Sequence, residues 1–124
     1  MIELIDGLPD GVVGFEAVGE VTAEDYRSVA IPAVEKALSR HKKISLIHVL
    51  GERFTGYSAS GEWDDAKLGL LHPLSWRRIA VVTDLEHMRT VVRHGGWLIP
   101  GEVKLFSNEQ RAEAEAWVSA GEAD

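Results

Sequence analysis

The feature that most constrains the fold of this chain is the alternation of short apolar runs with segments of helical period. Residues 43–50 (KISLIHVL) and 77–84 (RRIAVVTD) are mostly apolar runs of strand length, typical of central strands that are covered on both faces. After each of them comes a segment in which apolar residues recur at helical spacing. Strands that alternate with helices predict right-handed crossovers and a largely parallel sheet.

The start of the chain adds an antiparallel strand to this scheme. Residues 1–7 and 11–21 are β-type runs around a Pro-Asp-Gly turn, which predicts a hairpin. Residues 22–41 carry the strongest amphipathic pattern, with Thr22 as helix N-cap. Pro32 lacks a backbone donor and is expected to kink this helix or to separate its first turns.

The remaining elements are weaker and complete the order β-β-α-β-α-β-α-β-α. Helices are expected at 61–72 and 85–95, a last strand at 102–106, and a final helix that opens at Ser107 with Gln110 at the capping-box spacing. We therefore predict a single α/β domain over residues 1–124, with a mixed, mostly parallel sheet flanked by helices.

Composition excludes several classes of function. The chain has no cysteine, which rules out disulfides, thiolate zinc sites and cysteine nucleophiles. Its net charge of −7 argues against general binding to nucleic acid or to anionic membranes, which need a basic surface. The start of the chain lacks the features of a signal peptide, and no apolar stretch approaches the ~20 residues of a membrane span. We expect a soluble, cytoplasmic protein without integral membrane contact.

Catalytic and cofactor motifs are also missing from the sequence. It contains no Gly-x-Ser-x-Gly elbow, no dinucleotide fingerprint and no P-loop. The histidines include no i,i+4 pair with a nearby acid, and His48, inside an apolar run, is expected to be a hydrogen-bonded core residue. We predict no enzymatic activity, no cofactor and no metal site.

The order and spacing of these segments resemble the SpoIIAA-like family, within the wider STAS and Sec14-like group of folds. The resemblance runs nearly end to end through TAEDYRSVAIPAVEKAL, KISLIHVL followed by a Phe-Thr-Gly loop, RRIAVVTD, EVKLF and the closing AEAWV. It implies a four- or five-stranded mixed sheet flanked by helices and no known catalytic activity. In STAS relatives it also implies a partner-binding regulatory domain that is switched by phosphorylation of a serine.

The stretch 53–65 (RFTGYSASGEWDD) is where the resemblance would place that switch. The STAS relatives carry Asp-Ser-Ser-Gly here, and the nearest ungapped match puts Ser58 at the aspartate and Ala59 at the phosphorylated serine. Three carboxylates within 62–65 would fill the first turn of the next helix, where they stabilise its positive end and repel a phosphoryl group. We therefore interpret Ser60 as a helix N-cap and disfavour Ser58 and Ser60 as phosphoacceptors.

An uneven charge distribution gives a second candidate site. Residues 67–94 hold a surplus of basic side chains, with Arg89 and Arg93 as i,i+4 neighbours on one expected helix. Ligands of open α/β sheets favour the crevice beyond the carboxyl ends of the strands, which the loop at 83–85 would face. Arginines at the rim of such a cleft could hold a carboxylate or phosphate group. The simpler interpretation, which we prefer, is that these arginines pair with acidic side chains or stay solvated.

Residues 94–102 (HGGWLIPGE) combine an apolar cluster around Trp97 with flanking glycine and proline. Such a segment either packs on the sheet, covers a pocket or makes a dimer contact. Our first hypothesis is a non-enzymatic domain that acts through contacts with an unknown protein partner or as a homodimer. The alternative is a carrier or sensor of a small amphipathic, lipid-like ligand, as the Sec14-like side of the resemblance implies. Trp63 and Trp97 would then line a pocket, with Arg89 or Arg93 at the head group.

Overall fold

A five-stranded sheet forms the centre of the protein in the computed structural model, which describes residues 1–58, 75–95 and 101–120. The strands lie in the order β1-β2-β4-β6-β7. Their bounds are Ile2–Leu4 (β1), Val12–Ala17 (β2), Ile44–Leu50 (β4), Trp76–Thr83 (β6) and Glu102–Phe106 (β7). β1 pairs antiparallel with β2, and the other neighbours are parallel. The predicted mixed, mostly parallel α/β fold with an antiparallel edge strand is confirmed.

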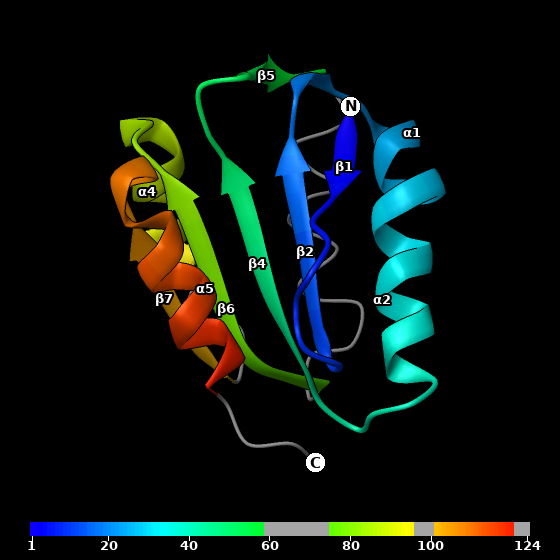
Figure 1. Cartoon of the computed structure of the whole chain (residues 1–124). Helices are drawn as coiled ribbons and strands as arrows, with labels where there is room; N and C mark the ends of the chain where they lie inside the picture. Colours follow the sequence, from blue (N-terminus) through cyan, green and yellow to red (C-terminus); the bar gives the residue numbers. More distant parts are fainter. Residues whose placement is uncertain (59–74, 96–100, 121–124) are drawn as a thin grey trace.

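In Figure 1 the arrows of β2, β4 and β6 all point toward the end of the sheet where β5 lies, and β1 points the other way. We call the end at which the parallel strands finish the carboxyl edge. The helical segments before β4 are α1 (Ala23–Asp25), a π-helical turn η1 (Tyr26–Ala30) and α2 (Ile31–Leu38). α4 (Glu86–Gly95) connects β6 to β7, and a 3-10 turn η4 (Asn108–Gln110) leads into α5 (Arg111–Ser119).

Alternating side chains of the strands build one core on each face of the sheet. The first face packs against η1, α2 and α4, and its buried strand residues include Val13, Phe15, Ala17, Ile44, Leu46, Leu50, Ile79 and Val81. The second face packs against Ala114 and Val118 of α5, and its buried strand residues are Ile47, Val49, Ala80, Val82 and Phe106. β4 is buried along its whole length, which explains its nearly continuous apolar sequence.

Pro32 separates the first turns of the long helix, as predicted. It has no backbone N–H to donate to the carbonyl of Ser28, so the regular i→i−4 ladder is interrupted there. The N–H of Ile31 bonds instead to the carbonyl of Tyr26, five residues back, which produces the π-helical turn. Ser28 Oγ donates to the Glu24 carbonyl at 2.8 Å.

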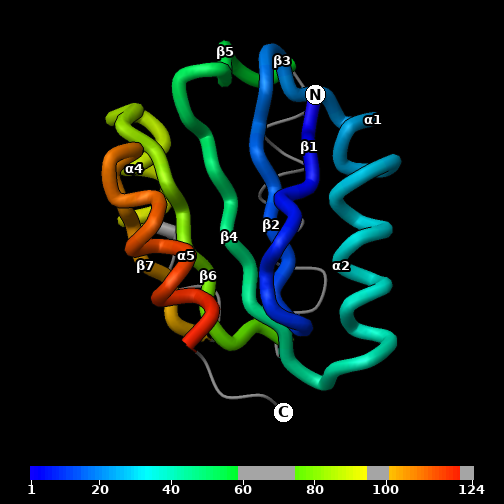
Figure 2. Tube along the Cα trace, in the orientation of Figure 1, coloured from blue at the N-terminus to red at the C-terminus, as the bar shows by residue number. Residues whose placement is uncertain are grey.

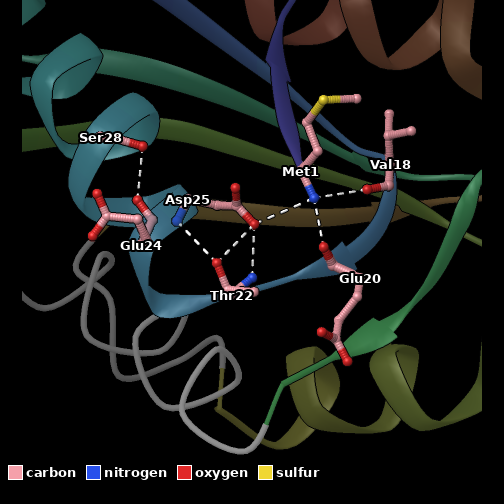
Figure 3. Close-up of polar contacts among 7 residues, drawn as sticks. All are labelled: Met1, Val18, Glu20, Thr22, Glu24, Asp25 and Ser28. Atoms are coloured by element: carbon pink, nitrogen blue, oxygen red, sulfur yellow. Dashed lines mark hydrogen bonds and ion pairs between the residues drawn. The ribbon is translucent and has the colours of Figure 1, made fainter.

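Thr22 caps this helical region by a reciprocal arrangement that is drawn in Figure 3. The N–H of Asp25 donates to Thr22 Oγ1 at 3.2 Å, and the N–H of Thr22 donates to Asp25 Oδ2 at 2.7 Å. The amino group of Met1 lies 3.2 Å from the same carboxylate oxygen and donates to the carbonyl of Val18. The predicted N-cap is therefore confirmed, and it also fastens the beginning of β1 to the helix start.

Two sequence predictions at the carboxyl edge need correction. The run 11–21 is not one strand, because Gly19 takes a φ of +62° that ends the extended chain after β2. The predicted Phe-Thr-Gly loop is a strand, β5 (Phe54–Tyr57), which pairs in parallel with β3 (Gly19–Val21). Figure 2 shows β3 and β5 side by side at this end of the molecule. The predicted helix at 61–72 lies outside the described residues.

Candidate functional site

The carboxyl edge brings together side chains from four separate parts of the chain. Glu16 lies beside Val49 in the register of β2 and β4, and Val49 lies beside Val82 in β6. The three residues thus form one row near the carboxyl ends of the strands, on the face that α5 covers. Glu16 is the acidic member of this otherwise apolar row, and its side chain is only 15% exposed.

Two arginines hold the Glu16 carboxylate. Arg53, in the β4–β5 connection, approaches it with Nε at 3.3 Å from Oε2 and with Nη2 at 3.2 Å from Oε1. Arg111, the first residue of α5, approaches Oε1 with Nη1 at 3.3 Å. Each arginine also has a second acidic neighbour, Glu3 at 2.9 Å from Arg53 and Glu115 at 3.8 Å from Arg111. A forked guanidinium on a carboxylate is the strongest form of such an ion pair.

A pocket of about 290 Å³ opens next to this ion-pair cluster. Val49 and Val82 supply apolar contacts, and the remaining lining comes from Glu16, Gly51, Glu52, Arg53, Asn108 and Arg111. Asn108 Oδ1 is buried and has no hydrogen-bond partner among the described residues. The backbone N–H of the same residue donates to Asp84 Oδ1 at 2.9 Å, which fixes the start of the last helical segment. The pocket lies beyond the strand ends, where open α/β sheets usually bind their ligands.

The surroundings of Glu16 keep its carboxyl group ionised. Partial burial raises the pKa of Glu16, but the hydrogen bonds and charges of Arg53 and Arg111 outweigh burial and leave the pKa below its ordinary value. The pKa of Asp25 is lowered in the same manner, since bonds from Thr22 and the amino group of Met1 outweigh the effect of burial. Both carboxylates therefore stabilise the folded state only while they are charged.

We predict that the free energy of unfolding of Glu16→Gln falls less steeply with decreasing pH than that of the parent chain. A folded-state pKa below the ordinary value of 4.5 means that the Glu16 contribution is complete above that pH and is lost as the pH falls below it. Unfolding by denaturant, followed between about pH 6 and about pH 3, should show a smaller loss of stability in Glu16→Gln than in the parent chain. Glu113→Gln, at an exposed position of α5, is the matched control. Identical profiles for Glu16→Gln and the parent would contradict the proposed ion-pair contribution.

The structure places the arginines of the predicted cationic site in different settings. Arg89 turns toward the strand ends, where its Nη1 donates to the carbonyl of Thr83 at 3.0 Å and to that of Phe106 at 3.3 Å. Arg93 is exposed on α4. Arg78 bonds to the Trp117 carbonyl at 2.7 Å, lies 4.9 Å from the centroid of the Trp117 ring and pairs with Glu102 at 3.5 Å. A ligand role for Arg89 and Arg93 stays a prediction.

Of the serine candidates, only Ser58 lies in the described part of the chain. Its N–H donates to the carbonyl of Val21 at 2.9 Å, which continues the pairing of β5 with β3. Its Oγ is buried and has no hydrogen-bond partner among the described residues. Ser60, Trp63 and Trp97 lie outside the described residues. His48 is buried in β4, and its ring meets Phe15 edge-on at 6.1 Å.

The Glu16 cluster was missed by sequence reasoning, although one signal was available. In the run VVGFEA, positions 12, 14 and 16 share one face, which places the Glu16 carboxylate on a face expected to be covered. A buried acid needs a cationic partner, but Arg53 and Arg111 are far from it in sequence and nothing local points to them. Across residues 1–58, 75–95 and 101–120, no three potential metal ligands come together. No helix in these ranges has the length and apolar character needed to cross a membrane.

A mostly parallel sheet with an antiparallel first strand and helices on both faces defines the class of this protein as a mixed α/β domain. The SpoIIAA-like family profile matches residues 12–119. The chain belongs to the SpoIIAA-like family.

Solved structures agree with this assignment. An uncharacterized protein of the DUF3478 family with a SpoIIAA-like fold, from Shewanella loihica PV-4, is 32% identical with a TM-score of 0.73, over 95% of this chain and 92% of that chain. The anti-sigma factor antagonist SpoIIAA in its unphosphorylated form has a TM-score of 0.57 over 91% of this chain and 96% of its own. Its identity is 14%, so the likeness extends to the fold alone. A search of curated proteins found no match.

Proposed function

We propose that this chain is a regulatory domain, with no catalytic activity of its own, that binds another protein through the carboxyl edge of its sheet. Membership of the SpoIIAA-like family carries this proposal, because domains of that family are generally regulatory and non-enzymatic. One solved structure of the same fold is an anti-sigma factor antagonist, a protein whose name describes an action on another protein. We treat residues 1–124 as one such domain.

The chemistry of the carboxyl edge supports a protein partner over an amphipathic small ligand. A carrier of an amphipathic molecule would need a largely apolar cavity. In the pocket beside Glu16, which has a volume of about 290 Å³, four of the eight lining residues are charged. The buried apolar side chains of the sheet pack in the two core clusters. Charged and polar groups around a small pocket are typical of a surface that selects a partner by complementary charge.

The proposed domain works without a serine switch at Ser58 or Ser60. Ser58 Oγ is buried, so a kinase could reach it only after local opening of the β5 region. The acidic side chains of the following sequence, at 62–65, would repel a phosphoryl group on either serine. Binding is therefore expected to depend on the surface of the folded chain and not on its phosphorylation.

The proposal is tested by recovering the tagged chain from its host after mild cross-linking and analysing it by native mass spectrometry. We expect a complex with a second protein at fixed stoichiometry and no phosphate on Ser58 or Ser60. A chain that carries a retained small molecule in place of a protein would favour the carrier. A homodimer alone would also contradict the proposal, and phosphate on either serine would overturn the absence of a switch.

A further inference from the structure

We propose that the pocket beside Glu16 receives a cationic side chain, a lysine or an arginine, of the protein partner. The inference rests on the proposed function and names the chemistry of the group that the carboxyl edge recognises. It is carried by the charge balance around the pocket, by the hydrogen-bonding groups left free inside it and by its shape.

The charge balance favours a cation. Arg53 and Arg111 are the two basic side chains of the lining, and both are already engaged with Glu16. The lining itself is balanced, with Glu16 and Glu52 against these two bases, and Glu3 and Glu115 pair with the same arginines from outside the lining. The lining and the ion-pair cluster together carry two more acids than bases, which gives the surroundings of the pocket a negative charge that an incoming cation would neutralise. An incoming anion would have to compete with the ionised Glu16 for both guanidinium groups.

Two acceptors of the lining have no donor in the described part of the chain. Asn108 Oδ1 is buried without a partner among the described residues, and such a group is costly unless a donor reaches it. Glu52 lies on the exposed side of the pocket and offers a carboxylate. Guanidinium and ammonium groups donate hydrogen bonds and cannot accept them, so they are suited to the two acceptors, Asn108 Oδ1 and the Glu52 carboxylate.

The shape of the pocket fits a long basic side chain. Val49 and Val82 are buried apolar residues of the lining, and Gly51 adds no side chain to fill the space. Lysine and arginine place their methylene stems on apolar surface and carry the charge at the tip. The stem would therefore lie over Gly51, above the buried valines, while the head group meets Glu52 and, once the Asn108 side chain turns toward it, Asn108 Oδ1.

Three small probes test this inference without the partner. Butylguanidinium, the isosteric but neutral butylurea and the anionic butyrate are titrated separately into the full chain labelled with nitrogen-15, and amide shifts are recorded. We expect butylguanidinium to saturate with a Kd of about 1–10 mM. Its shifts should be largest at Gly51, Glu52, Asn108 and Arg111, and binding should weaken in high salt. Equal affinity for butylurea, stronger binding of butyrate, or shifts centred elsewhere would each overturn the proposal.

Two pocket variants and one control variant extend the titration. Glu52→Gln removes one negative charge from the pocket and should raise the Kd of butylguanidinium about fivefold or more. Gly51→Ala narrows the pocket, because the added methyl would lie 3.7 Å from Val49 Cγ1 and 4.0 Å from Asn108 Oδ1 without a clash. Asp6→Asn also removes one carboxylate, at an exposed position between β1 and β2 toward the opposite edge of the sheet, and should leave the Kd unchanged. Parental affinity in both pocket variants would overturn the proposal.

The partner itself separates this inference from the proposed function. If Glu52→Gln and Gly51→Ala recover less of the partner from the host than the parent and Asp6→Asn do, the pocket takes part in recognition. If all four chains recover the same partner equally, the domain binds a protein but the pocket inference is wrong. If no protein is recovered while butylguanidinium still binds at the pocket, the proposed function fails and the cation-binding pocket remains supported.

Discussion

Replacing Phe15 with alanine is expected to lower the free energy of unfolding by about 3–5 kcal/mol. Phe15 lies in the middle of β2, is fully buried and belongs to the larger core cluster. Its ring meets His48 of the neighbouring strand edge-on, so the substitution removes an aromatic contact as well as apolar area. Because small domains are stabilised by only about 5–15 kcal/mol, the midpoint of denaturant unfolding should fall sharply.

The control for this prediction is Leu4→Ala. Leu4 is the register partner of Phe15 on β1, but 52% of its surface is exposed. An exposed apolar residue away from special features changes stability by about 0.5 kcal/mol or less on substitution. The core described above would be contradicted if the two variants unfolded at similar denaturant concentrations.

Gly14→Ala is expected to have the second largest effect, a loss of about 1–3 kcal/mol or more. A Cβ at this position would lie 2.5 Å from Leu8 Cδ1, 2.9 Å from Ile5 Cβ and 3.2 Å from Ile47 Cγ2. The end of Leu8 can rotate away, but Ile5 Cβ is attached directly to the backbone. The segment between β1 and β2 would therefore have to lift from the sheet, where Ile5 and Leu8 pack on the second core cluster.

Gly51→Ala is the matched control for Gly14→Ala. Its added methyl meets atoms only at ordinary contact distance, and its backbone has no positive φ that would strain alanine. The change should be neutral or stabilise the protein by about 0.4–1 kcal/mol, through the unfolded state. Thermal unfolding of both variants measures the difference. Equal stability of Gly14→Ala and Gly51→Ala would show that the close approach over Gly14 is absent.

The main elements of the fold could be predicted from local sequence. Residues 43–50 and 77–84 are apolar enough to be recognised as buried strands, and Pro32 marks the interruption of the helix by a simple backbone rule. The pairing of β3 with β5 could not be predicted. It depends on the positive φ of Gly19 and on a bond from the Gly19 N–H to the Arg53 carbonyl, which join segments far apart in the sequence.

The candidate site was harder to predict than the fold for the same reason. The basic surplus at 67–94 made Arg89 and Arg93 candidates for an anion site, although pairing with acids or solvation was the preferred interpretation. The Arg89 guanidinium donates to two backbone carbonyls at the strand ends. The pocket beside Glu16 is instead built from one residue of β2, the β4–β5 connection and the start of α5. Charge counted along the chain does not reveal such a cluster, because the register of the sheet decides which side chains meet.

The measurement that most directly tests recognition at the carboxyl edge is hydrogen–deuterium exchange of the chain alone and in complex with the partner recovered from its host. We predict slower exchange on binding in 51–58, 84–89 and 107–111, the segments that follow β4, β6 and β7. The opposite edge, at 7–11 and 39–43, should exchange at the same rate in both states. Protection confined to that opposite edge, with the carboxyl edge unchanged, would contradict the proposed mode of binding.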